Sequence, residues 1–232
     1  MTKKTFETKP FSWNFKKSTV SDFDEHIRMS IPHYLEGHEL ILKVSEFFLK
    51  EESLCYELGT STGAISKKLY EKFLHKNINI IGIDNEKEMI KLANREKQKN
   101  LNFEHADLKD YHFENSDLII SYYTMQFIHA KHRQNIFDRI YDSLNWGGGF
   151  ILFEKVRAPD ARFQDMTSQI YDDFKSSNGF SDEEILLKTR SLRGVLDPYT
   201  AEENMRYLER AGFKDIVSIQ KFLCFEGFLA IK

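Results

Sequence analysis

The residues best suited to hold a ligand are seven consecutive positions, Glu57 to Gly63, which read Glu-Leu-Gly-Thr-Ser-Thr-Gly. They join a short apolar stretch to a stretch with helical spacing. Gly59 allows a sharp turn at the end of the predicted strand, and Ser61 and Gly63 are small enough for a ligand to approach the backbone. Free N–H groups at the start of the following helix favour an anionic or carboxylate-bearing ligand. A tight turn that binds nothing is the alternative.

Two acidic residues follow the next two predicted strands. Asp84 closes the second strand, where a carboxylate can accept hydrogen bonds from both ribose hydroxyls of an adenosine, and Asn85 can donate to the same sugar or to the ring. Asp107 follows the third strand, where it can accept from an exocyclic amine while Leu108 packs on an adenine ring. Each acid also has a purely structural explanation, because Asp84 can cap a helix and Asp107 can sit in a solvated turn.

A pair of tyrosines, Tyr122 and Tyr123, follows the fourth predicted strand. Aromatic faces suit a ligand that carries a positive charge, so both are candidate catalytic residues. One of the two is equally well explained as part of the core. His129 and His132 are three residues apart, but no Cys or carboxylate set of metal-ligand character accompanies them. We therefore predict a surface loop there and no metal site.

The elements that position these residues alternate along the chain. Short strands are expected at 54–58, 78–83, 101–104, 117–121, 150–154, 216–220 and 222–231, and helices at 21–30, 36–50, 64–74, 86–97, 132–144 and 200–211. Such alternation indicates parallel strands joined by right-handed crossovers, and the last two strands form an antiparallel hairpin. The prediction is an α/β, Rossmann-like fold with a mostly parallel seven-stranded sheet.

Three further segments complete this organisation. Residues 1–50 are expected to form an N-terminal arm and helices that cover the site, and residues 51–232 the binding domain itself. Residues 163–193 look largely helical and too long for a simple crossover, which predicts a helical insertion at about 160–195 that lies over the strand ends. Gly147 to Gly149 are expected to form a flexible turn before the fifth strand, because a strand rather than a helix follows them.

Bulk composition excludes several classes of protein. The 232 residues carry a formal net charge of −3, with Lys and Glu interspersed, so no nucleic-acid-binding face is signalled. No apolar run is long enough to span a bilayer, and no signal peptide is evident. Cys55 and Cys224 each lie in an apolar stretch, which favours reduced, buried thiols over a disulfide. The expected location is the cytoplasm.

The residues of the glycine loop limit the class of ligand that we expect. A dinucleotide-binding fingerprint requires glycines where Ser61 and Ala64 stand, so the fit to that motif is poor. The pattern acidic-x-Gly-x-small-x-Gly instead resembles the first motif of class I S-adenosylmethionine-dependent methyltransferases. That resemblance implies their fold and S-adenosyl-L-methionine as the cofactor.

Across nearly the whole chain, the sequence resembles one family, the carboxy-S-adenosyl-L-methionine synthases, whose product serves the modification of wobble uridine in tRNA. The matching stretches include Ile31-Pro32-x-Tyr34, Tyr56-Glu57-Leu58-Gly59, Ile81-Gly82-Ile83-Asp84-Asn85, Thr124-Met125-Gln126-Phe127, Glu154-Lys155 and Asp173-Phe174-Lys175-x-x-Asn178-Gly179. The last of these is more specific than the glycine loop. The resemblance also implies a homodimer in which the helical insertion helps to build the neighbour's site.

We predict the following cofactor-binding residues for S-adenosyl-L-methionine, S-adenosyl-L-homocysteine or the carboxylated cofactor: Tyr34, Glu57, Gly59, Thr60, Ser61, Gly63, Asp84, Asn85, Met89, Asp107, Leu108 and Tyr122. Most of these positions come from the resemblance to the family.

Three positions depart from the family pattern. Thr60 stands where the family has Cys, and Tyr122 where it has Asn. The family also uses an Arg of the insertion to pair with the extra carboxylate of its product, and Thr189 occupies that position here. Arg190 is the candidate replacement, although one residue along a helix rotates a side chain by about 100°. A guanidinium is the natural partner of a carboxylate, and Thr cannot take its place.

Three functions remain open on the sequence. The first is methyl transfer from S-adenosylmethionine to a small-molecule acceptor, in which the protein mainly aligns the reactants. The second is the family's own reaction, in which the methyl group is deprotonated and captures carbon dioxide released from prephenate. The third is a protein that binds an adenosyl ligand without catalysis and acts through its dimer surface.

Overall fold

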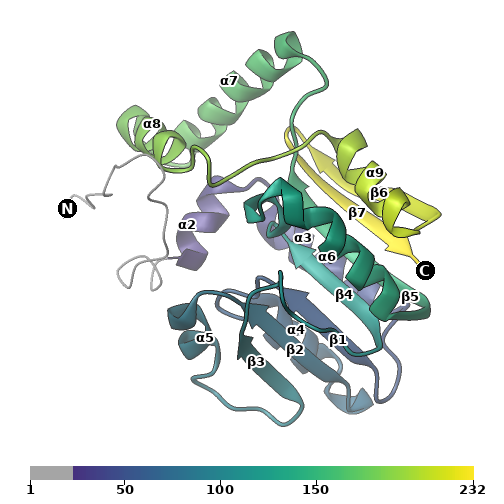
Figure 1. The fold of residues 1–232 in the computed structure, drawn as a ribbon. Coiled ribbons are helices and arrows are strands. Elements are labelled where there is room, and N and C mark those ends of the chain that lie inside the picture. Colours follow the sequence, from purple (N-terminus) through teal and green to yellow (C-terminus); the bar gives the residue numbers. More distant parts are fainter. Residues whose placement is uncertain (1–22) are drawn as a thin grey trace.

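The fold is a seven-stranded sheet covered by helices on both faces (Figure 1). The structure, a computed structural model, describes residues 23–232, so the predicted arm at residues 1 to about 20 lies outside the described residues. The strands follow the order β3-β2-β1-β4-β5-β7-β6. Their bounds are β1 Leu54–Leu58, β2 Asn79–Asp84, β3 Leu101–His105, β4 Ser116–Tyr122, β5 Leu144–Lys155, β6 Asp215–Phe222 and β7 Phe225–Ile231.

The first five strands are parallel, and β7 pairs antiparallel with both β5 and β6. This confirms the predicted Rossmann-like arrangement with its C-terminal hairpin. Chain order reverses between β1 and β4, because β2 and β3 lie on one side of β1 while β4 and β5 lie on the other. In open α/β sheets such a switch point leaves a crevice at the carboxyl ends of the strands.

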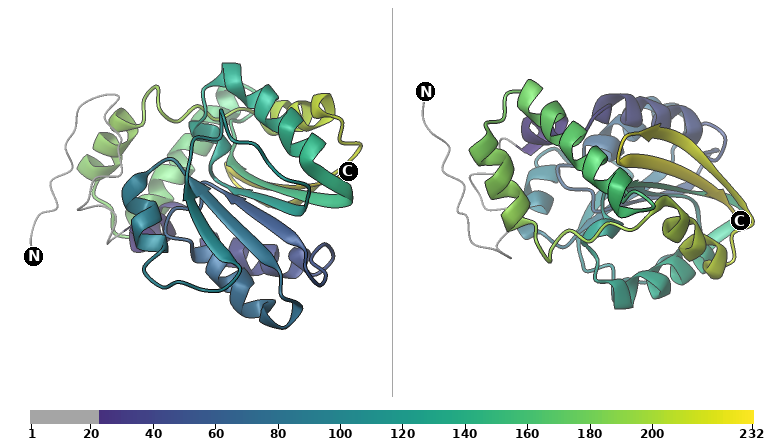
Figure 2. Two further views of the ribbon diagram at one scale, coloured as in Figure 1. Left: turned by 60° about the horizontal axis from the view of Figure 1, so that its bottom comes forward. Right: turned by 90° about the horizontal axis from the view of Figure 1, so that it is seen from above.

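Helices form a layer on each face of the sheet (Figures 1 and 2). The bounds of these and the remaining helices are α2 Phe23–Ser30, α3 Tyr34–Ser45, α4 Ala64–Lys72, η1 Leu74–Lys76, α5 Lys87–Ala93, η2 Met125–Phe127, α6 Ala130–Ser143, α7 Ala161–Ser177, α8 Asp182–Ser191 and α9 Ala201–Ala211. Successive strand residues point to opposite faces. Cys55 therefore packs with the α3 and α4 side, and Tyr56 with the α6 and α9 side.

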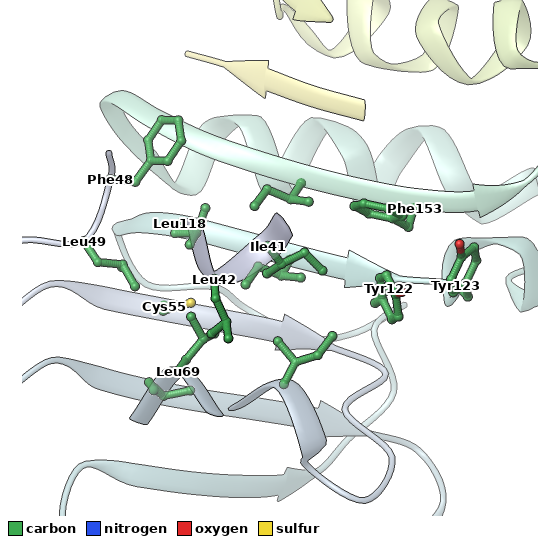
Figure 3. Close-up of a cluster of buried hydrophobic side chains, with 14 of the residues drawn as sticks. Ile41, Leu42, Phe48, Leu49, Cys55, Leu69, Leu118, Tyr122, Tyr123 and Phe153 are labelled. Carbon is green, nitrogen blue, oxygen red and sulfur yellow. The ribbon is translucent and has the colours of Figure 1, made fainter. Parts of the chain in front are cut away.

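The core on the α3 and α4 face is shown in Figure 3. Ile41 and Leu69 are fully buried there against strand residues such as Leu118. Cys55 and Cys224 are both buried, and no disulfide joins them. Within residues 23–232, no helix combines the length and apolar character that a membrane span needs.

The predicted turn at Gly147 to Gly149 is wrong, because these residues belong to β5, which starts at Leu144. Their backbone groups are paired: Gly147 N donates to Lys232 O at 2.8 Å, and Lys232 N donates to Gly148 O at 3.0 Å. A Cβ at Gly149 would meet the Phe48 ring at 2.8 Å. Packing thus requires Gly149, whereas Gly147 has open space around it and is favoured by its backbone φ of 78°.

The helical insertion is two helices, α7 and α8, rather than one long element. Gly179, with a φ of 95°, ends the first, and Ser181 with Glu184 forms a capping box that starts the second. An Asn-Gly pair followed by Ser-x-x-Glu is a recognisable stop and start signal. In Figure 1 the two helices stand beside α2, on the side toward which the carboxyl ends of β1 to β5 point.

Candidate functional site

A cavity of about 530 Å³ opens at the carboxyl ends of the parallel strands. Its floor consists of the residues that follow β1, β2, β3, β4 and β5, and its cover comes from α2, the start of α3, and the insertion helices α7 and α8. His26, Ser30 and Tyr34 line it from the N-terminal side. The cavity therefore lies at the switch point that the strand order creates.

The cavity brings together nearly all the residues predicted from the sequence. It is lined by Tyr34, Glu57, Gly59, Thr60, Ser61, Asp84, Asn85, Met89, Asp107, Leu108, Tyr122 and Tyr123. Two predicted residues, Gly63 and Arg190, do not line it. Gly59 and Asp84 thus open onto the same space.

The turn after β1 is fixed from two sides. Gly59 has a φ of 68°, and its N–H and that of Thr60 both donate to Ile83 O, at 2.8 and 2.9 Å. A Cβ at Gly59 would collide with Thr124, whose hydroxyl donates to Leu58 O at 2.8 Å. Glycine is required here by the neighbouring strand end, and the turn is held in one shape before any ligand binds.

Gly63 has a different role from the one predicted. It lies at the N-terminus of α4 with a φ of 78°, and a Cβ there would meet the Phe103 ring at 2.6 Å. Its small size serves helix-to-sheet packing and Gly63 does not line the cavity, so ligand contact at this residue stays a prediction.

Glu57 organises the loop from below. Its carboxylate accepts hydrogen bonds from the Thr60 hydroxyl at 2.7 Å and from Ser66 N at 3.0 Å, and also from the Ser66 hydroxyl. The side chain is buried, and this burial raises its pKa to about 7. These bonds connect the end of β1 to the first turn of α4.

Asp84 joins the loops that follow β1 and β2. One carboxylate oxygen accepts from Ser61 N at 2.9 Å, and the other accepts from Glu86 N at 2.8 Å. The second bond closes a local turn after β2 and does not cap the next helix, because the N-cap residue of α5 is Glu86 and no side chain caps it. A carboxylate has about four lone-pair sites, so these bonds leave acceptor capacity for a ligand. Burial raises the pKa of Asp84.

Asp107 lies at the edge of the cavity beyond β3. Its carboxylate accepts from Lys109 N at 3.0 Å and pairs with Lys109 Nζ at 2.8 Å. Leu108 beside it is buried. The acid and the apolar side chain therefore meet at one end of the cavity, as adenine recognition requires.

Tyr122 and Tyr123 form a buried wall (Figure 3). The Tyr122 hydroxyl donates to Tyr34 O at 2.7 Å, and the Tyr34 and Tyr122 ring centroids are 5.1 Å apart. Burial raises the pKa of both Tyr122 and Tyr123. Neither phenol ionises easily, so this geometry favours a lining role over proton abstraction.

Arg190 is exposed and stays outside the cavity, whereas Thr189 and Arg193 line it. The Thr189 hydroxyl donates to Ile185 O at 2.9 Å within its own helix. The rotation of about 100° between neighbouring helical positions accounts for the difference. Arg190 therefore does not line the cavity of its own chain, and its role as a carboxylate partner stays a prediction.

Sequence reasoning missed a group of lysines opposite the glycine loop. Lys155, Lys175 and Lys188 line the cavity around Tyr171. Lys155 Nζ and Lys175 Nζ lie 4.2 and 4.4 Å from the Tyr171 ring centroid. Lys188 Nζ lies 2.8 Å from both His26 Nε2 and the Ser30 hydroxyl. Lys155 and Lys175 lie in stretches that match the family, but their meeting with Lys188 depends on how α7 and α8 fold back.

Burial and the neighbouring lysines disfavour the charged forms of Lys188 and Lys155. Burial lowers the pKa of Lys188 to about 7, with further contributions from Lys175 and Lys155. Burial also lowers the pKa of Lys155. Among the described residues, no group of three or more His, Cys, Asp or Glu side chains is arranged to hold a metal ion. The site therefore combines a rigid backbone turn and an acidic rim with a cationic wall.

Comparison with known proteins gives consistent results. Residues 56–148 match the family model described as a methyltransferase domain. The chain is 40% identical over 225 residues to the carboxy-S-adenosyl-L-methionine synthase of Staphylococcus epidermidis, covering 96% of this chain and 98% of that protein. It is 34% identical over 223 residues to the enzyme of the same name from Campylobacter lari, covering 95% and 94%.

Two solved structures share the fold. Phosphoethanolamine N-methyltransferase 2 of Haemonchus contortus, in complex with S-adenosyl-L-methionine, matches with a TM-score of 0.68 and 14% identity over 94% of this chain and 57% of that one. Human N-acetylserotonin methyltransferase, also in complex with the cofactor, gives a TM-score of 0.56 and 16% identity, covering 97% and 63%.

Proposed function

This chain belongs to the carboxy-S-adenosyl-L-methionine synthase family and is an S-adenosylmethionine-dependent transferase, and we propose that it carboxylates that cofactor in the cavity described above. The observation that carries the proposal is the meeting of two unlike surfaces in one cavity: an adenosyl-sized cradle around Gly59 and Asp84, and the lysines Lys155, Lys175 and Lys188. The first fits the cofactor, and the second fits an acid.

The residues present fit the cofactor. Asp84 and Asn85 would hold the ribose hydroxyls, and Asp107 and Leu108 the adenine. The turn at Gly59 to Ser61 would receive the amino-acid part of the molecule. When bound, the cofactor supplies an activated methyl carbon, which either is transferred or loses a proton and takes up carbon dioxide.

What the chain itself contributes is alignment, exclusion of water and charge. Tyr122 and Tyr123 line the cavity, and their aromatic rings would stabilise the sulfonium. The helices α2, α7 and α8 cover the cavity and would exclude water from the reacting carbon. The lysines would hold a carboxylic acid such as prephenate in contact with it, and proximity of this kind accounts for a large part of most rate enhancements.

The direct test is to incubate the protein with S-adenosylmethionine and prephenate and to weigh the nucleoside product. We expect a product heavier than the cofactor by one carbon dioxide. Formation of S-adenosylhomocysteine together with a methylated acceptor, and no carboxylated nucleoside, would contradict the proposal.

One observation favours methyl transfer to a small-molecule acceptor as the second candidate. Thr189 occupies the position where the family resemblance implies a carboxylate-binding Arg, and Arg190 lies outside the cavity. A cavity without that Arg also accommodates an uncarboxylated cofactor. The same mass measurement separates the two reactions.

We also propose that the protein is a homodimer formed through α7. Phe163, Met166 and Ile170 are 52, 50 and 53% exposed, although all three are large and apolar. Their spacing places them on one side of the helix. A second copy is the occupant we propose for this stripe, since the family resemblance implies a dimer that uses this same insertion.

The setting of the reaction is part of the same proposal. A carboxylated cofactor would be consumed in the modification of wobble uridine in tRNA, as the resemblance to the family implies. The buried thiols of Cys55 and Cys224 fit a reducing compartment, which supports the cytoplasm.

A further inference from the structure

Lys155 is a cation of the cavity wall that has no ion-pair partner among the described residues. It ends β5, one strand along from the tyrosines of β4, and its side chain is half-buried. Within residues 23–232, its Nζ makes no ion pair or hydrogen bond. It lies over the ring of Tyr171, 4.2 Å from the ring centroid. A cation–π contact offsets only part of the cost of burying an ammonium group.

Most of the charged side chains around Lys155 are cationic. Lys175 from α7 and Lys188 from α8 line the same wall, and Arg157 and Arg193 stand at its edge. Asp172 is paired with Lys175 at 2.7 Å. The carboxylates of Glu57 and Asp84 accept hydrogen bonds from the loops on the opposite side of the cavity. The wall is therefore complementary to an anion.

We propose that Lys155 Nζ binds the carboxylate that lies beside the reacting carbon of the cofactor. The inference deepens the proposed function and rests on it. The shared chemistry is a carboxylate beside a sulfonium, whether it belongs to the acid reactant or to the carboxymethyl group of the product.

The location of Lys155 supports this assignment over the nearby arginines. Arg190 is outside the cavity, and Arg193 is exposed at its lip. Lys155 instead follows a buried strand directly, and its backbone N–H donates to Gln126 Oε1 at 2.8 Å. Gln126 in turn donates to Tyr123 O at 3.2 Å. This chain of bonds fixes the start of the Lys155 side chain relative to the tyrosine wall.

A carboxylate would be stabilised between the sulfonium of the cofactor and the ammonium group of Lys155. A sulfonium and an ammonium in one cavity repel each other, and the repulsion is strong where water is excluded. A carboxylate that contacts both removes this repulsion. S-adenosylhomocysteine has neither the carboxymethyl group nor the sulfonium charge, so its affinity should not depend on Lys155.

The test compares Lys155→Met, Lys155→Arg and the exposed control Lys97→Met with the unmodified protein. Titration calorimetry measures the affinity for S-adenosylhomocysteine and for carboxy-S-adenosylmethionine, and initial rates measure the KM for prephenate. We expect K155M to leave the S-adenosylhomocysteine affinity within about twofold while lowering the preference for carboxylated ligand, or raising the KM, by about tenfold or more. K155R should recover a substantial part of that effect, and K97M should change neither quantity.

The two carboxylate sources separate in the same experiment. A loss confined to carboxy-S-adenosylmethionine assigns Lys155 to the product carboxylate, and a loss confined to the KM assigns it to the acid reactant. Unchanged values for both in K155M, with S-adenosylhomocysteine still bound, would overturn the inference while leaving the proposed function intact. Failure of the unmodified protein to bind S-adenosylhomocysteine would instead count against the proposed function.

Discussion

At the scale of single residues, Asp84 carries two functions at once. Its carboxylate holds the neighbouring loop through Ser61 N and starts the turn after β2 through Glu86 N. The same group faces the cavity. One carboxylate has enough acceptor sites for these two backbone bonds and for a ligand, so the structural role of Asp84 does not compete with the predicted ligand contact.

We expect Asp84→Ala to weaken the binding of S-adenosylhomocysteine by about 1.5–3 kcal/mol, the range of a hydrogen bond to a charged group. Titration calorimetry measures this directly. Asp110→Asn, at an exposed position outside the cavity, is the matched control. An unchanged affinity in the alanine variant would exclude Asp84 from the ligand site.

The buried Glu57 predicts a pH dependence of stability. Its pKa is raised from 4.5 to about 7, so the folded state binds the proton more tightly than the unfolded state does. The contribution of Glu57 to stability is therefore complete below about pH 4.5 and is lost as the pH rises through 7, by up to about 3 kcal/mol.

Urea unfolding at pH 5 and pH 8 tests this expectation. The free energy of unfolding of the unmodified protein should fall relative to that of Glu57→Gln as the pH rises. Glu71→Gln, at an exposed position, should follow the unmodified protein. Parallel pH profiles for the unmodified protein and E57Q would contradict the assignment.

At the scale of elements, the insertion is fastened to the last turn of α2. The Tyr171 hydroxyl donates to Ser30 O at 2.8 Å, and Asn178 Nδ2 donates to Met29 O at 3.1 Å. Lys188 Nζ reaches the Ser30 hydroxyl at 2.8 Å. The last carbonyls of a helix have no partner within it, so α7 and α8 supply partners that a local cap would otherwise provide.

We expect Asn178→Ala to loosen this attachment, because Met29 O loses its partner. Hydrogen exchange followed by mass spectrometry should show faster exchange in α2, α7 and α8, by several-fold, with unchanged exchange in β1 and β4. Ser177→Ala removes only a bond within α7 and serves as the control. Equal protection of α2 in the two variants would show that the bond from Asn178 does not hold the insertion in place.

The elements differ in how far the sequence predicts them. The strand ends at Gly59, Asp84 and Asp107 were predictable, because turn residues and acids directly follow apolar runs. The start of β5 was not, because three glycines normally signal a turn and only the contact with Phe48 and pairing with Lys232 explain them. The lysine wall was also out of reach, since it forms only when α7 and α8 return to the cavity.

At the scale of the whole molecule, the apolar stripe of α7 is the surface that most needs a partner. We expect Met166→Glu to place a charge in the proposed dimer interface and to shift the protein toward the monomer. Light scattering coupled to size-exclusion chromatography measures the mass in solution. Ser168→Glu adds the same charge to another side of the helix, and it should leave the mass unchanged.

An M166E variant with the mass of the unmodified dimer would remove α7 from the interface, and a monomeric unmodified protein would remove the dimer altogether. Neither result would change which residues of one chain line the cavity.

The cavity draws its wall from both ends of the described chain, from His26 in α2 to Phe225 in β7. During synthesis on a ribosome, β7 emerges after every other segment that lines this wall. A growing chain that has not yet reached β7 therefore offers the cofactor an incomplete pocket. The full stabilisation that a bound small molecule gives comes only after β7 has joined the sheet.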